Sequence, residues 1–397
     1  MDPSPENLQH LTNFLGQTLA PDAATRKQAE VQLGNAKVQQ GYPLLLLRLV
    51  SSAAVPDQIR LQGAIQFKNL VVSHWVLSEV HDFHVNEADK PAVKAEIVEA
   101  MLAVPDKLQP FLSEALSCIS KADFPLDQKW PELVPKLMQS LSSPDPAVII
   151  ATLKTTHAIA RKYVTASHTD ELWAEIAMVL SQTHAKLMET QVSCLAMLQQ
   201  QAANKPALDQ LFQTLDLIAK IFHDLNYQDI PEVFEDNLDT WMAGFHTLLT
   251  LPAPVTALFQ PESDDDKLSA MHAMQRSICE ALHLYADKYI VIVEDSDRGS
   301  RPDEREVFQK HLGTFVEDIW ALLTHLGVQA NYDELVAAAI GFLSSVLRGT
   351  HFSFFQPAHL QSIVNNVVVP GLKIRESDEE DFEDNPLEYM QVRHPKP

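Results

Sequence analysis

The stretch PDPAVIIATLKTTHAIARKYV, residues 144–164, begins with a Pro-Asp pair and continues as an amphipathic helical pattern. Proline interrupts a preceding helix, and aspartate can accept hydrogen bonds from the free N–H groups of the next one. Four further Pro-Asp pairs begin at positions 21, 56, 105 and 302. The first four pairs are 35, 49 and 39 residues apart, which is the length of a two-helix repeat. The fifth, 158 residues past the fourth, opens either the same helix of a later repeat or the other helix of a pair.

Apolar residues elsewhere recur every three or four positions, which is typical of one buried helix face. Three such stripes lie at Leu208, Leu211, Phe212, Leu215, Ile218, Phe222 and Leu225, at Leu268, Met271, Met274, Ile278, Leu282, Tyr285 and Tyr289, and at Phe308, Leu312, Phe315, Ile319, Leu322 and Leu326. The pattern predicts an all-α protein, a right-handed α-solenoid superhelix of about seven to eight HEAT-type helix pairs. One helix is expected over 229–251, followed by a loop over 251–266.

Composition limits the possible partners. The chain has 30 basic and 53 acidic residues, a net charge of −23, which argues against nucleic acid because phosphate binding needs a basic face. An acidic surface favours basic proteins as partners, or serves only to keep a large surface soluble. Three widely spaced cysteines suit reduced thiols in a cytosolic or nuclear protein. The acidic start MDPSPENLQ has no apolar segment, so no signal peptide is expected. The longest aliphatic run ends at Arg48, so membrane insertion is not expected either.

The sequence offers no catalytic or cofactor site. The glycine-containing motifs GxxxxGK[ST], GxGxxG and GxSxG are absent, and only 11 glycines occur. His81 with His84 and Cys279 with His283 each offer two metal ligands, whereas structural zinc needs four and catalytic zinc three. We therefore expect a protein that is not an enzyme and that holds no metal or cofactor.

The segment ESDEEDFEDNPLE, residues 376–388, holds eight acids in thirteen positions. Like charges at this density repel one another, so an isolated helix is not expected here. Phe382 and Leu387 are apolar anchors that a purely solvating tail would not need. The segment is either an interaction element or a solvated acidic loop.

Several stretches resemble the importin-β (karyopherin) superfamily of transport receptors. RKQAE at 26–30 resembles the N-terminal motif of that superfamily, and AIQFKNL at 64–70 with Trp75 resembles the second half of the same domain. LNYQDIPEVFEDN at 225–237 and DEEDFEDNPLEY at 378–389 are similar to one branch only, the CAS-type exportins. The resemblance runs from about residue 5 to residue 389.

The resemblance implies a nuclear export receptor that binds a Ran-type GTPase in its GTP state and returns importin-α to the cytoplasm. It also implies contacts with nucleoporins, a monomeric state, and shuttling between nucleus and cytoplasm by way of the nuclear envelope. Three regions follow: an importin-β-type N-terminal domain over 1–104 (HEAT repeats 1–2 and the start of 3), central CAS-type HEAT repeats over 105–375, and an acidic insertion-like segment with a divergent end over 376–397. The family pattern continues past Met390 with further repeats, so the chain is expected to be an N-terminal portion.

The same resemblance places GTPase contacts in the first repeats and in the acidic segment. The positions that it suggests are Arg60, Lys68, Asn69, Trp75, Asp378, Glu379, Glu380, Asp381, Glu383 and Asp384. The first four are either contacts or packing residues, because buried helix faces repeat such patterns. Two other functions remain open: a general HEAT-repeat scaffold or regulatory subunit without a transport cycle, and an enzyme built on an α-solenoid.

Overall fold

The computed structural model describes residues 2–77, 83–105, 107–124, 130–201, 203–261, 267–290, 302–326, 329–348, 355, 357–371, 379 and 382–386. Within these ranges the regular elements are helices and there is no strand. Their bounds are α1 Pro5–Gln17, α2 Ala23–Lys37, α3 Tyr42–Ser51, α4 Asp57–His74, α5 Lys90–Ala103, α6 Gln109–Asp123, α7 Leu133–Ser140, α8 Pro146–Val164, α9 Asp170–Gln200, α10 Lys205–Asn226, α11 Glu232–Glu235, α12 Leu238–Leu249, α13 Ala253–Thr256, η1 Ala257–Phe259, α14 Ala270–Tyr289, α15 Pro302–His325, η2 Ala330–Tyr332, α16 Asp333–Arg348, α17 Pro357–Ile363, the π-helical turn η4 Val364–Val368, and α18 Val369–Gly371.

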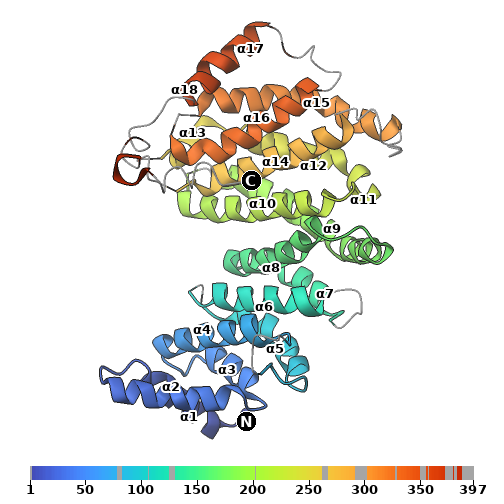
Figure 1. Ribbon diagram of the computed structural model, residues 1–397. Coiled ribbons are helices and arrows are strands. Elements are labelled where there is room, and N and C mark those ends of the chain that lie inside the picture. Colours follow the sequence, from blue (N-terminus) through green and yellow to red (C-terminus); the bar gives the residue numbers. More distant parts are fainter. Residues whose placement is uncertain are drawn as a thin grey trace. The chain divides into compact units, whose positions relative to one another are not determined.

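The chain forms two compact units. Unit 1 comprises Met1–Gly244 with Ala253–Phe259, and unit 2 comprises Phe245–Pro252 with Gln260–Pro397. In unit 1 the first ten helices form five consecutive pairs, visible as successive layers in Figure 1. The second helices of the pairs, α4, α6, α8 and α10, pack side by side along their lengths, and the first helices form the other layer. This is the expected HEAT arrangement, in which each pair buries its apolar face against the next.

In unit 2, α14 and α16 pack along each other as the second helices of unit 1 do, and α15 lies between them in sequence and contacts both. The Gln275 side chain of α14 donates to the Leu248 carbonyl of α12 at 3.3 Å, and α15 contacts α16. These two further pairs before α17 bring the described residues to the expected seven to eight pairs. The fifth Pro-Asp pair stands at the start of α15, a first helix, whereas those at 56 and 144 precede second helices. It therefore opens the other helix of a pair.

Two of the Pro-Asp pairs cap helices as expected. The Asp22 carboxylate accepts from the Thr25 backbone N–H at 2.8 Å, and that of Asp145 accepts from the Ala147 N–H at 2.9 Å. The prediction is wrong for Asp57, because Pro56 occupies the cap position and Asp57 is the first helical residue without a capping hydrogen bond. Asp106 lies outside the described residues, as does the side chain of Asp303.

The predicted apolar stripes form the core. All residues of the α10 stripe are at most 2% exposed except Leu211, which is half-buried. The α14 stripe is buried from Met271 onward, and the α15 stripe is buried from Phe308 to Ile319. No single helix in the described ranges is long and apolar enough to cross a bilayer; Leu238–Leu249 and Ala253–Phe259 reach that length only together, across a bend.

The expected single helix over 229–251 is wrong: it is two helices, α11 and α12, separated at Asp236 and Asn237. The Asn237 side-chain amide donates to the Val233 carbonyl at 2.9 Å, which satisfies a carbonyl that the helix would otherwise need to pair. The loop expected over 251–266 is also partly helical, since α13 and η1 occupy 253–259.

Gly63 lets α4 approach α3 closely, and this gives a first prediction. A Cβ atom at Gly63 would lie 2.8 Å from Leu49 Cδ2 and 3.2 Å from Val50 Cγ2, both in the core. We expect Gly63→Val to lower the free energy of unfolding by about 2 kcal/mol, because overpacking forces neighbours to move. Gly34→Ala in α2 is the control: nothing lies within 4 Å, so it should stabilise by up to about 1 kcal/mol through helix propensity. Urea unfolding measures both, and equal effects would contradict the close packing.

His272 in unit 2 gives a pH prediction. Its ring is 3% exposed, packs against Tyr332 with ring centroids 4.9 Å apart, and burial lowers its pKa from 6.5 to about 4. Above pH 6.5 the ring is neutral in both states. As the pH falls below 6.5, His272 becomes protonated in the unfolded chain, whereas in the folded chain it stays neutral down to about pH 4. The free energy of unfolding therefore falls between pH 6.5 and pH 4.

We therefore expect acidification from pH 7 to pH 5 to lower the free energy of unfolding by about 2 kcal/mol through His272 alone. Urea unfolding at the two pH values should show a correspondingly smaller loss in His272→Gln. His325→Gln, at an exposed position of α15, is the control and should retain the full loss. The same pH dependence in His272→Gln as in the unsubstituted protein would contradict the assignment.

Candidate partner-binding surface

The four N-terminal positions suggested by the resemblance lie on α4 and its C-terminal end. Asn69 is exposed, and Lys68 is half-buried with its Nζ 3.7 Å from Glu114 Oε1 of α6. Both belong to the face of α4 that its neighbours leave accessible. Lys68 and Asn69 are therefore available to a partner.

Arg60 has a structural role. Its side chain is buried, its Nε donates to the Val50 carbonyl at 2.8 Å, and its Nη1 lies 3.4 Å from Asp57 Oδ1. The Val50 carbonyl belongs to the last turn of α3, where no intrahelical donor remains. Arg60 thus caps α3 from the neighbouring helix, and its guanidinium is turned inward.

Trp75 is also a packing residue. It is 1% exposed and directly follows α4, and the Lys90 ammonium of α5 lies 5.4 Å from its ring centroid. Its Nε1 is buried and donates to no acceptor in the part of the chain that the structure describes. Trp75 therefore joins α4 to α5, and a partner would not reach it without local unfolding.

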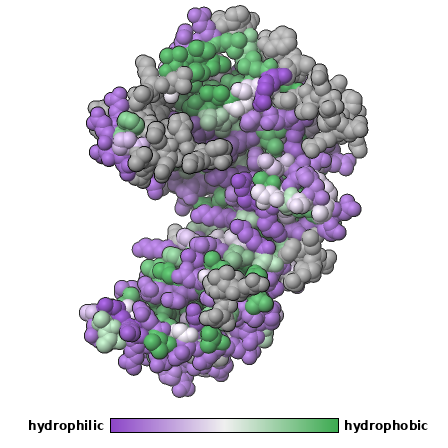
Figure 2. Space-filling view, viewed as in Figure 1, coloured by the Kyte–Doolittle hydropathy of each residue, from purple (hydrophilic) through white to green (hydrophobic). Residues whose placement is uncertain are grey.

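Apolar side chains on the same accessible face of α4 were not predicted. Val72 is 49% exposed, and Val76 and Leu77, which follow the end of the helix, are 58% and 72% exposed. Val72 lies off the buried stripe of α4, and its position on the helix is a signal that the sequence pattern could have given. Figure 2 shows the hydrophobic residues on the visible face of unit 1 scattered among hydrophilic ones. With Lys68 and Asn69, these three residues form what we call the α4 face.

The acidic segment belongs to unit 2. Glu379, Glu383 and Asp384 are exposed, as is Phe382. Asp378, Glu380 and Asp381 lie outside the described residues. The described carboxylates are therefore accessible to solvent and to a partner.

The stretch at 225–237, together with Asp224 just before it, stabilises the junction of α8 and α10. Gln228 Nε2 donates to the carbonyls of Tyr163 at 2.7 Å and Ala166 at 3.1 Å, at the C-terminal end of α8. Asn226 donates to the Phe222 carbonyl at 2.7 Å. Asn226 and Gln228 thus serve the packing of this repeat.

Asp224 is the centre of a buried ionic cluster at that junction. Its carboxylate is 1% exposed and lies 3.1 Å from His157 Nε2, 3.2 Å from Arg161 Nη1 and 2.8 Å from His223 Nδ1. Burial alone would raise the pKa of this carboxyl. Hydrogen bonds from His157 and His223, with the attraction of their charges, outweigh burial and hold the pKa well below its usual range. The ionised form is therefore the stable one, and it holds α8 against α10.

The described residues form no group of three or more His, Cys, Asp or Glu that could hold a metal ion. Of the two pairs considered from the sequence, His81 lies outside the described residues. Cys279 is fully buried, which raises the pKa of its thiol, and His283 lies 3.4 Å from Asp287 instead. Among the described residues, Cys279 and His283 belong to no group that could hold a metal ion.

Comparison with known proteins agrees with this architecture. The model of the importin-β N-terminal domain matches residues 29–103, and the Cse1 family model matches residues 159–393. "Exportin-2" of Xenopus laevis is 39% identical over 392 residues, and "Exportin-2" of Homo sapiens is 38% identical over the same length. Each alignment covers 98% of this chain and 38% of the relative, so the chain spans well under half of their length.

Among solved structures, one described as "The exportin Cse1 in its cargo-free, cytoplasmic state" has a TM-score of 0.83 and 30% identity, covering 98% of this chain and 40% of that one. A second, of the nuclear transport receptor Lph2 of S. cerevisiae, has a TM-score of 0.59 at 17% identity, covers 96% of this chain and 38% of that one, and shares the fold. An importin-β N-terminal domain, followed in the sequence by stacked helix pairs, defines an importin-β-type repeat protein. Within that superfamily, the chain belongs to the Cse1 family.

Proposed function

We propose that this chain is part of a nuclear export receptor that binds a Ran-type GTPase in its GTP state and returns importin-α to the cytoplasm. The observation that carries the proposal is 38–39% identity to Exportin-2 proteins along almost the whole chain. This function consists of binding and releasing partner proteins, so it needs accessible surfaces and no catalytic site. The proposal extends to nucleoporin contacts, a monomeric state, and shuttling between nucleus and cytoplasm through the nuclear envelope.

For the GTPase contact we propose the α4 face and the acidic segment, within an N-terminal domain over 1–104 and the region 376–397. Lys68 and Asn69 would act directly, whereas Arg60 and Trp75 would act only by holding α4 in place, because both are buried. Glu379, Glu383 and Asp384, with Asp378, Glu380 and Asp381, would meet a basic surface of the GTPase. We further propose that the central CAS-type HEAT repeats occupy residues 105–375.

A binding experiment tests the proposal. The GTPase is locked in the GTP or GDP state and added to the chain with and without importin-α, and affinity is measured by surface plasmon resonance. We expect binding at least about tenfold tighter to the GTP form, weakened by salt where acidic residues contribute. Equal binding to both forms would favour the alternative function, a HEAT-repeat scaffold without a transport cycle.

Val72→Asp tests the α4 face within this proposal. It places a charge where an apolar contact is proposed, and we expect affinity for the GTP form to fall about tenfold or more. Val192→Asp on α9 is a matched control, because Val192 is also 49% exposed but lies on a first helix. If the two substitutions weaken binding equally, the contact lies elsewhere.

A further inference from the structure

In unit 1, the seam between α5 and α7 is less closely packed than its neighbours in the layer of first helices. The backbones of α3 and α5 approach each other closely, and so do those of α7 and α9. The backbones of α5 and α7, which the structure describes in full, do not approach in this way. Side chains that reach across the seam therefore have a large share in holding these two repeats together.

One end of the junction is closed by buried contacts. The Lys94 ammonium of α5 lies 3.1 Å from Asp123 Oδ2 at the end of α6 and 5.8 Å from the ring centroid of Trp130, just before α7. Asp123 and Trp130 are both buried. In the layer of second helices, Lys162 near the C-terminal end of α8 donates to the carbonyl of the buried Phe124, just after α6, at 2.8 Å. Both layers are thus joined where α5 and α7 begin and where α6 and α8 end.

The opposite end of the seam is held by an exposed ion pair. The Lys136 ammonium of α7 reaches across to α5, where it lies 2.8 Å from Glu99 Oε1 and 3.3 Å from the Ala95 carbonyl. The side chains of Lys136 and Glu99 are 33% and 62% exposed, so water and salt compete with the pair. We call this pair the Lys136 tether.

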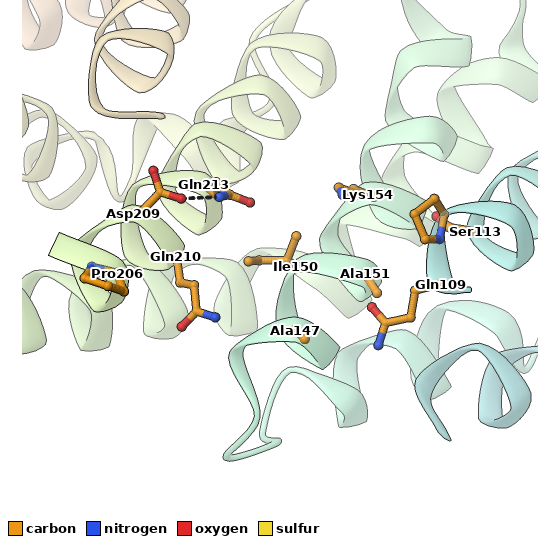
Figure 3. A pocket seen from close by; sticks show the side chains of 11 residues that line it. Gln109, Ser113, Ala147, Ile150, Ala151, Lys154, Pro206, Asp209, Gln210 and Gln213 are labelled. Carbon is orange, nitrogen blue, oxygen red and sulfur yellow. Dashed lines mark hydrogen bonds between the residues drawn. The ribbon is translucent and has the colours of Figure 1, made fainter. Parts of the chain in front are cut away.

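The layer of second helices is also open at the end where the tether lies. A groove of about 350 Å³ runs across the N-terminal halves of α6, α8 and α10, and its lining includes Gln109 and Ser113 of α6, Ala147 and Ile150 of α8, and Gln210 of α10. Figure 3 shows Ile150 between Gln210 on one side and Gln109 with Ser113 on the other. These halves of α6 and α8 follow the C-terminal ends of α5 and α7 in the chain. Because side chains leave this space open, α6 and α8 can shift here without overlapping.

We propose that the junction between the α5–α6 repeat and the α7–α8 repeat is a hinge, fixed at the end where Lys94 and Lys162 make their buried contacts and able to open at the Lys136 tether. When the tether breaks, the C-terminal end of α7 moves away from α5 while the fixed end stays in place, and the curvature of unit 1 changes. Raised ionic strength has the same effect, because it screens the exposed ion pair. The hinge lies within unit 1 and does not rest on the proposed function.

Double electron–electron resonance on the whole chain tests the hinge. One pair of spin labels spans the seam, at Ala53→Cys just after α3 and Ser142→Cys just after α7. A reference pair lies on one side of the seam, at Ser142→Cys and at Ser181→Cys in α9. All three positions are exposed. The half-buried Cys118 is replaced by serine in every protein so that it takes no label, and the other two cysteines are buried.

Lys136→Met removes the charge and keeps much of the length of the side chain. It should lengthen the mean distance across the seam by about 2 Å, the scale of helix shifts in switching proteins. In the protein with Lys136, a rise from about 0.01 M to about 1 M salt should lengthen that distance likewise, because the screening length falls to about 3 Å. The double variant Lys136→Glu with Glu99→Lys restores an ion pair and should restore the shorter distance. The reference distance should stay constant throughout.

Lys186→Met is the matched control, because Lys186 pairs with Glu189 at 3.0 Å within α9 and crosses no seam. It should leave both distances unchanged, with circular dichroism confirming that each variant is folded. An unchanged distance across the seam in folded Lys136→Met, an equal lengthening in Lys186→Met, or a distance that does not respond to salt would overturn the proposal. Equal lengthening of the reference distance would also overturn it, since the opening would then not be confined to this junction.

Discussion

Trp241→Ala should lower the free energy of unfolding of unit 1 by about 3–5 kcal/mol, the usual cost of deleting a large buried aromatic side chain. Trp241 is 1% exposed, and its ring centroid lies 5.0 Å from that of Phe222 and 5.9 Å from that of Phe234. Its Nε1 also donates to His184 Nε2 at 3.5 Å. The substitution would leave a cavity among rings that cannot all move inward.

Urea unfolding followed by far-ultraviolet circular dichroism measures this effect without relying on tryptophan fluorescence. Trp241→Phe should recover most of the loss, because it refills much of the volume. Val192→Ala, at an exposed position of α9, should change stability by less than about 0.5 kcal/mol. A Trp241→Ala variant as stable as Val192→Ala would show that this aromatic cluster is not a core.

Asp224→Ala should lower the free energy of unfolding by about 3 kcal/mol at pH 7, since it removes the buried anion that three basic side chains share. The low pKa of Asp224 in the folded state determines the pH dependence. The stabilisation is fully present above the unfolded value of 3.8 and is lost as the pH falls below it. The difference between the variant and the unsubstituted protein should therefore shrink below pH 4.

Asp216→Ala on the same helix is the matched control for this prediction. Asp216 pairs with Lys220 at 2.7 Å within one helix, so we expect its replacement to cost less than that of Asp224, which three basic side chains share. Urea unfolding at several pH values compares the two variants. A loss in Asp224→Ala no larger than in Asp216→Ala would mean that the cluster does not hold α8 to α10.

Sequence patterns predicted the helices well because each buried stripe is a local property. The stripe from Leu208 to Leu225 predicted both α10 and its core face, and the Pro-Asp spacing predicted the pairing of helices. The break between α11 and α12 was missed because it depends on one side-chain hydrogen bond, from Asn237 to Val233. Periodicity does not record such a bond.

The candidate site was predicted less completely. A family motif places Arg60, Lys68, Asn69 and Trp75 together, but only packing against α3, α5 and α6 decides that two of them are buried and two accessible. The groove lined by α6, α8 and α10 was not predicted, because its residues come from three helices spread over about a hundred residues and no local pattern joins Ser113 to Gln210.

The reach of Gln228 has a consequence for synthesis on the ribosome. Its side-chain amide donates to the Tyr163 carbonyl 65 residues earlier, so the last turn of α8 lacks this hydrogen bond until α10 and Gln228 have been translated. This repeat would then be completed only by the residues that follow α10. A nascent chain arrested near residue 200 should exchange its amide hydrogens rapidly around Tyr163, and one long enough for Gln228 to have left the ribosome should protect them.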